Sequence, residues 1–192
     1  MTASLTLLDF VKELAAKQPT PGGGGAAAVA GAIGASAAHM AANYTTRKKD
    51  VESGAASEAE ALMKSLDGPA VLTVADADAS AYADLQRSWK DTTMSSTDKA
   101  AIEARALNVP ISLLEQCVAH ICEIEAFLPV CNPNITSDAK VGIHLLAGAA
   151  RAAYQTAVVN KPPAEELERL AALLRQVRAA EDRVLGLCVG NE

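Results

Sequence analysis

Residues 18–44 read QPTPGGGGAAAVAGAIGASAAHMAANY, and this stretch decides the class of fold. Alanine is the best helix former and is poor in strands, so the run predicts an α-helix over residues 25–44. Pro19 and Pro21 stiffen the chain that leads into it. Because this helix is apolar nearly all round, we expect it to lie at the centre of a bundle.

The composition extends this prediction to the whole chain. Of the 192 residues, 50% are hydrophobic but only 3% are aromatic, so the apolar mass is mostly small or aliphatic. This favours an all-α protein whose helices approach closely, folded as one domain over residues 1–192. The formal net charge of −6 suits a soluble cytoplasmic protein and offers no basic surface for nucleic acid.

Hydrophobic periodicity and breaker residues predict the remaining helices. Thr6 is expected to cap a first helix that stops before Pro19. Further helices are expected at residues 51–66, 69–89, 98–127 (kinked by Pro110), 139–159 and 167–184. No alternating strand pattern of useful length occurs, so the sequence predicts a bundle of about six to seven helices.

Neither a membrane span nor a disulfide framework is expected. The longest apolar run, residues 26–38, has about half the length that a bilayer crossing needs. No basic segment precedes an apolar one at the N-terminus, as a secretory signal would require. Cys117, Cys122, Cys131 and Cys188 form no CxxC pair, so we interpret them as buried free thiols of a reducing compartment.

The glycine run at 22–25 is a candidate ligand surface. It lacks the Lys-Ser/Thr of a nucleotide-binding loop and follows no strand, and the prolines before it argue against a flexible linker. Two interpretations remain open. The run could present free backbone N–H groups to a flat or anionic ligand, or it could allow a close helix crossing.

Asp78 is the sharper signal. On a helix its neighbours three, four and seven residues away are apolar: Val71, Val74, Ala75, Ala81, Tyr82 and Leu85. A carboxylate on such a face should have a raised pKa, which suits proton transfer or the stabilisation of a substrate cation. A structural aspartate with a buried partner would show the same pattern, whereas Asp76 has ordinary neighbours.

Weaker candidates lie elsewhere in the sequence. Asp138 stands at an expected helix start, where aspartate is common for its interaction with the helix dipole. Lys48 and Lys49 could hold an anionic ligand tail, although such charges are more often simply solvated. The three histidines, His39, His120 and His144, have no metal-ligand spacing, so no metal is expected.

Together the motifs resemble a known family. PTPGGG (19–24), NYTTRKK (43–49), DADASAY (76–82), NVP (108–110), SDAKVG (137–142) and Asn160 occur in that order. Their order and spacing resemble the cyclodeaminase/cyclohydrolase family, which includes the cyclodeaminase domain of formiminotransferase-cyclodeaminase and the stand-alone methenyltetrahydrofolate cyclohydrolases. The resemblance covers about residues 5 to 190.

The resemblance implies an all-helical homodimer that acts on tetrahydrofolate derivatives without a metal or other cofactor. It assigns the family's catalytic aspartate to Asp78. Substrate-binding positions would be Pro21, Gly22, Gly23, Gly24, Lys48, Lys49 and Asp138. On this hypothesis the three glycines pack against the flat pterin, and one of the two lysines meets the glutamate tail.

The implied activity is hydrolysis of 5,10-methenyltetrahydrofolate to formyltetrahydrofolate. The alternatives are ammonia elimination from formiminotetrahydrofolate and a catalytically silent dimer that binds a folate or a protein partner. No nucleic acid or membrane partner is expected. The sequence departs from the family pattern in five places. Gly25 replaces a serine, Arg47 a glycine and Val51 an aromatic residue, while Ser88-Trp89-Lys90 replaces Leu-Pro-Lys and Thr156-Ala157 replaces Asn-Val.

Overall fold

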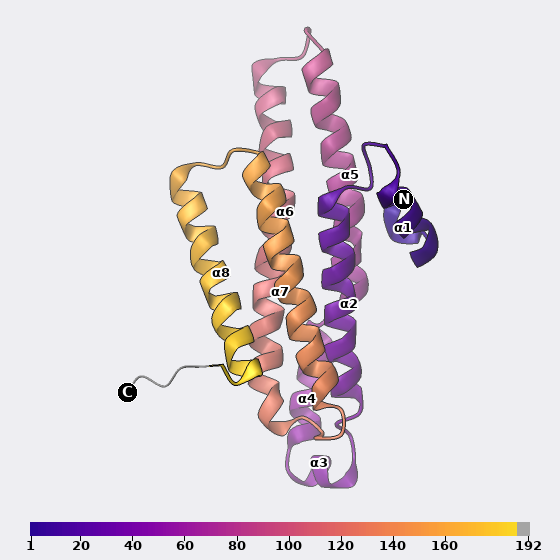
Figure 1. Ribbon diagram of the computed structural model, residues 1–192, viewed down its shortest axis with the longest axis vertical. Helices are drawn as coiled ribbons and strands as arrows, with labels where there is room; N and C mark the ends of the chain where they lie inside the picture. The colour runs from indigo at the N-terminus through magenta and orange to yellow at the C-terminus, as the bar shows by residue number, and fades with distance from the viewer. Residues whose placement is uncertain (188–192) are drawn as a thin grey trace.

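The computed structural model describes residues 1–187 and shows an elongated bundle of long helices (Figure 1). The helices are α1 (Leu7–Ala15), α2 (Gly23–Asn43), α3 (Lys48–Glu52), α4 (Ala55–Ser65), α5 (Gly68–Lys90), α6 (Ser96–Phe127), α7 (Thr136–Val159) and α8 (Ala164–Leu185). Two 3₁₀ turns complete them, η1 (Thr2–Ser4) and η2 (Leu128–Val130). No strand occurs within residues 1–187, so the all-α prediction is confirmed.

The helix ends follow from local hydrogen bonding. The Thr6 hydroxyl accepts the Asp9 N–H at 3.1 Å and caps α1, as the sequence predicted. The Asp67 carboxylate accepts the Ala70 N–H at 2.9 Å and starts α5, with Pro69 in its first turn. These caps satisfy N–H groups that a helix cannot pair internally.

The core is built around α2, which packs against α7 and α5 along its length. Small residues permit the close approach. A Cβ at Gly34 would lie 3.0 Å from the Gly142 carbonyl oxygen, and one at Gly142 would lie 2.8 Å from the Gly34 carbonyl oxygen. On the α5 side, a Cβ at Gly31 would lie 3.2 Å from Val71 Cγ1. The backbones of α2 and α7 therefore touch where neither has a side chain.

Length and composition alone would allow α2 to cross a membrane, and no other helix within residues 1–187 meets that test. Its neighbours in the bundle explain why α2 is so apolar. The alanines of α2 are buried against α4, α5 and α7, as expected for the core helix of a bundle.

Several local predictions need correction. The expected helix over 51–66 is two helices, because Gly54 adopts a left-handed φ of +86° between α3 and α4. α2 begins at Gly23, two residues before the expected start at Gly25. Cys117 and Cys131 are buried free thiols as predicted, but Cys122 is exposed. Cys188 lies outside the described residues.

The α2–α7 crossing gives a stability prediction with a control on the same helix. Gly142→Ala should lower the free energy of unfolding by about 1–3 kcal/mol, since the new methyl group meets backbone that cannot move aside. Gly148→Ala places its methyl group in open space and should raise stability by about 1 kcal/mol through helix propensity. Urea denaturation of both variants checks this. Equal effects would show that the crossing is not tightly packed.

Candidate active site

A cavity of about 320 Å³ opens at the N-terminal end of α2. It is bounded by α2, α5, α6 and the C-terminal end of α7, and the α5–α6 hairpin extends beyond it (Figure 1). Its lining residues are Pro19, Thr20, Gly22, Gly23, Gly24, Asp78, Ala81, Tyr82, Leu85, Trp89, Ala106, Thr156, Val159 and Asn160. The glycine run and Asp78, which the sequence singled out separately, thus share one cavity.

Gly24 and Asp78 are in direct contact. A Cβ built on Gly24 would overlap Cγ and both carboxylate oxygens of Asp78, the farthest of the three at 2.6 Å. Only glycine therefore allows the carboxylate to lie against the first turn of α2. The close helix contact that the glycine run was expected to allow is confirmed, and the same bare backbone also lines the cavity.

Two opposing effects act on the pKa of the Asp78 carboxyl. Burial against α2 raises its pKa above the ordinary aspartate value, and a hydrogen bond from the backbone N–H of Gly25 lowers it. Burial is the larger effect, so the net shift is upward. This agrees in direction with the shift that the apolar stripe on α5 predicted. A carboxylate of this kind is suited to accept and return a proton.

Gly22, Gly23 and Gly24 line the cavity at the start of α2. Gly22 is the N-cap and supplies no capping side chain, so the first N–H groups of α2 have no side-chain acceptor at that position. Pro21 is buried and does not line the cavity, whereas Pro19 does. A Cβ at Gly25 would lie 3.4 Å from Pro21 Cβ, an ordinary contact, so space alone does not require the fourth glycine.

The α5 side of the cavity carries an aromatic pair. The rings of Tyr82 and Trp89 meet edge to face, with centroids 6.4 Å apart and planes at 86°. Trp89 is 64% exposed and Tyr82 36% exposed, so neither ring belongs to the main core. The cavity therefore has a backbone wall on α2 and an aromatic wall on α5.

Asn160 links the end of α7 to a break in the hydrogen bonding of α6. Pro110 has no N–H, so it cannot bond the carbonyl of Ala106, four residues earlier in α6. The Asn160 side-chain amide donates to that carbonyl at 3.1 Å and to the Thr156 carbonyl at 3.0 Å. The carbonyl that Pro110 leaves unbonded in α6 is thus bonded by Asn160 at the end of α7, and both Ala106 and Asn160 line the cavity.

Asp76 has a structural role. Its carboxylate accepts hydrogen bonds from the backbone N–H groups of Thr2 and Ala3 and so holds η1 against α5. The sequence distinguished Asp78 from Asp76 by their helical neighbours, and the structure gives the two carboxylates different surroundings.

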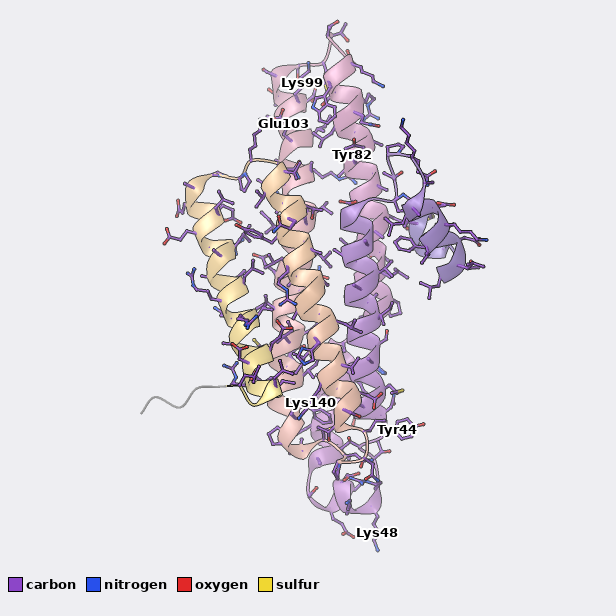
Figure 2. The ribbon with its side chains drawn as sticks, in the orientation of Figure 1. Tyr44, Lys48, Tyr82, Lys99, Glu103 and Lys140 are labelled. Atoms are coloured by element: carbon purple, nitrogen blue, oxygen red, sulfur yellow. The ribbon has the colours of Figure 1, made fainter. Side chains whose placement is uncertain are left out.

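Three of the predicted binding residues lie away from the cavity. Figure 2 shows Lys48 at the opposite end of the bundle from the α5–α6 hairpin, with Tyr82 toward the hairpin end. Lys48 is exposed and pairs with Glu52 at 3.8 Å, and Lys49 is exposed in the same short helix. Asp138 lies in the first turn of α7 and accepts the Ser137 hydroxyl at 3.2 Å. One chain alone does not join these residues to Asp78.

Each of the three histidines has a polar side-chain partner. His144 meets Glu181 at 3.1 Å, His120 meets Glu123 at 3.2 Å, and His39 meets Asn43 at 3.0 Å. Across residues 1–187, no three His, Cys, Asp or Glu side chains are grouped as a metal site would require.

Sequence reasoning missed part of the cavity. Ala81, Tyr82 and Leu85 were recognised only as apolar neighbours of Asp78, although the same helical spacing, continued to Trp89, traces the α5 wall. Thr156, Val159 and Asn160 share one face of α7, but nothing in their local sequence connects that face with α2.

Residues 6–179 match the family described as formiminotransferase-cyclodeaminase. The chain belongs to this family. It is 30% identical to methenyltetrahydrofolate cyclohydrolase of Methylorubrum extorquens over 96% of both chains. Its fold is that of formiminotetrahydrofolate cyclodeaminase from Thermotoga maritima, whose crystal structure matches with a TM-score of 0.81 at 23% identity, covering 97% of each chain. The family resemblance that the motifs indicated is confirmed.

The raised pKa of Asp78 predicts a stability effect that depends on pH. Between the unfolded and folded pKa values the native chain binds more protons, so its stability falls as pH rises through that window. Asp78→Asn removes the ionisable group and with it this loss of stability at higher pH. The variant should be at least as stable as the unaltered chain at pH 7, and its advantage should shrink as the pH is lowered toward 4.

Thermal denaturation at pH 4, 5.5, 7 and 8 measures this effect. Glu166 provides a control of opposite sign, because the hydrogen bond from Arg169 lowers its pKa. Glu166→Gln should be slightly destabilising at pH 7, with a smaller effect in acid, since the pair is partly exposed. A clearly less stable Asp78→Asn protein at pH 7 would contradict the assignment of Asp78 as a destabilising, functional carboxylate.

Proposed function

We propose that this chain is a methenyltetrahydrofolate cyclohydrolase, which adds water to 5,10-methenyltetrahydrofolate and releases formyltetrahydrofolate. The single observation that carries the proposal is Asp78, a partly buried carboxylate with a raised pKa in a cavity beside a bare helix start. The relative from Methylorubrum extorquens, similar over nearly the whole chain, supports the same reaction.

The first step uses the carbon between the folate nitrogens N5 and N10. This carbon shares the positive charge of the methenyl ring, and a water oxygen forms a bond to it while the C=N π electrons move onto nitrogen. Asp78 accepts the proton that the water loses. The carboxylate also attracts the cationic ring, which in turn lowers the Asp78 pKa and keeps the base ionised in the complex.

The second step opens the ring. The C–N5 bond breaks as Asp78 returns its proton to N5, and the remaining hydroxyl proton leaves to solvent as the formyl C=O forms. One proton is released overall and Asp78 is regenerated. In free enzyme the raised pKa should make kcat/KM fall as the pH drops through it.

The glycine wall suits the flat pterin. Gly22, Gly23 and Gly24 present backbone without side chains, so a planar ring can lie against them within reach of Asp78. The proposed chemistry draws on water, Asp78 and backbone groups and on no further cofactor. We place the enzyme in the cytoplasm, in keeping with its charge of −6.

A spectroscopic assay with methenyl- and formiminotetrahydrofolate side by side tests the proposal. Ring opening of the methenyl compound should be the faster reaction, and Asp78→Asn should reduce it by at least about 100-fold. Dialysis against EDTA should leave the rate unchanged. Preference for the formimino compound would make the chain a cyclodeaminase. Turnover of neither, with no folate binding by calorimetry, would favour a catalytically silent dimer.

We propose further that the chain acts as an antiparallel homodimer. Ile33 and Met40 on α2 and Tyr44 at its C-cap are 47%, 39% and 60% exposed and are spaced seven and four residues apart. They form an exposed apolar stripe on a helix that packs against α5 and α7 on its other sides, as an interface with a second helix would need.

The position of this stripe explains the distant lysines. Ile33 lies at the middle of α2. If a two-fold axis passes through this point, a residue that follows Ile33 by a given number lies opposite the residue of the second copy that precedes Ile33 by the same number. Tyr44, eleven residues after Ile33, would face Gly22, eleven residues before it. Lys48 would then lie beyond the glycine run of the second copy, where it could meet a folate tail.

Mixing two defective variants tests this arrangement. Asp78→Asn and the double variant Lys48→Ala/Lys49→Ala should each be impaired alone. After mixing by reversible dissociation, half of the dimers would carry one intact site, which restores about a quarter of the unaltered activity. No gain on mixing would refute the shared site.

The interface itself is tested by sedimentation. Ile33→Asp should give monomers, and Leu185→Asp on α8, at a comparably exposed position, should leave the dimer intact. Dimers of unchanged affinity in Ile33→Asp would contradict the proposed pairing.

A further inference from the structure

Trp89 is the one tryptophan of the chain, and it lines the cavity. It is 64% exposed, although an indole ring buries a large apolar area when it has the chance. It also stands within the three residues, Ser88-Trp89-Lys90, where the chain departs from the family pattern. The family motifs therefore give this ring no role.

Helix geometry directs the ring toward the cavity. Asp78, Tyr82, Leu85 and Trp89 are spaced four, three and four residues apart and lie along one face of α5. Helical side chains lean toward the N-terminus, so Trp89 reaches back over the turns that precede it. Its edge-to-face contact with Tyr82, two turns earlier, shows this orientation. The indole is thus held on the same wall as the catalytic carboxylate.

We propose that Trp89 is a positioning residue that stacks on the aminobenzoyl ring of the folate substrate. The inference rests on the proposed function. The reacting carbon must lie near Asp78, and it is flanked by two rings, the pterin and the aminobenzoyl. The glycines on the α2 wall of the cavity take the pterin. The aminobenzoyl ring then falls on the α5 side, where Tyr82 and Trp89 line the wall.

The exposure of Trp89 decides between the two rings. The aminobenzoyl ring carries the charged glutamate tail, which must leave the cavity toward water. The ring next to that tail therefore lies at the mouth, and Trp89 is the more exposed of the two aromatic lining residues. A flat ring on an indole face gains apolar burial and stacking, and the contact with Tyr82 fixes the indole in advance.

Fluorescence tests the contact directly, because Trp89 is the sole source of tryptophan emission. 5-Formyltetrahydrofolate should protect Trp89 from acrylamide and lower the quenching constant at least about twofold. A tetrahydropterin that lacks the aminobenzoylglutamate part should protect it little. The control is Trp89→Phe/Leu185→Trp, which moves the fluorophore to α8 at a comparably exposed position, where the folate should give no protection.

Kinetics separates positioning from a structural role. Trp89→Ala should raise KM for methenyltetrahydrofolate roughly fivefold to tenfold and leave kcat within about twofold, and Trp89→Phe should retain most of the affinity. A chain that turns over the substrate but shows unchanged KM in Trp89→Ala, or equal protection by tetrahydropterin, would overturn this inference alone. Absence of both turnover and folate binding in the unaltered chain would overturn the proposed function with it.

Discussion

The contact between α2 and α7 at Gly34 and Gly142 is the constraint on which the rest of the molecule depends. Each glycine faces a carbonyl oxygen of the other helix at a distance that admits no side chain. Alanines continue this narrow interface in both directions, and on the other side Gly31 leaves room for the Val71 side chain of α5. A chain with so few aromatic residues has little volume with which to fill wider gaps, so its core gains density by bringing backbones together.

The site follows from this packing. Since α2 is fixed between α7 and α5, its first turn must pass beside Asp78, and the contact is possible only because residue 24 has no side chain. The same closeness removes water from the carboxylate and raises its pKa against the opposing effect of the Gly25 N–H. The feature that packs the bundle therefore also sets the protonation behaviour of its candidate catalytic group.

Much of this was visible in the sequence, and the part that was not has a physical reason. Periodicity located Asp78 because a helix repeats its faces regularly, and the glycine run was conspicuous because glycine disfavours helices. By contrast, Asn160 reaches the cavity through a carbonyl that Pro110 leaves unbonded on a different helix. Such a pairing exists only after the chain has folded. The prediction of a single helix over 51–66 was wrong, because Gly54 adopts a left-handed conformation that divides it. The prediction that Cys122 is buried was also wrong, because the absence of a CxxC pair does not show which face of a helix a cysteine occupies.

The candidate site residues fall into a buried group and an exposed group, and this difference suggests how one fold can serve related reactions. Asp78 and the glycines belong to helices of the packed core, so they cannot shift without loss of the α2–α5 contact. Trp89 and the basic residues Lys48 and Lys49 lie outside that core, on exposed surface. Hydrolysis of a methenyl group and elimination from a formimino group both need a proton carrier beside the same folate carbon, and on the proposed function Asp78 of the packed core is that carrier. On the proposed function, binding of the rest of the folate falls to these peripheral residues, which can change without disturbing the carboxylate.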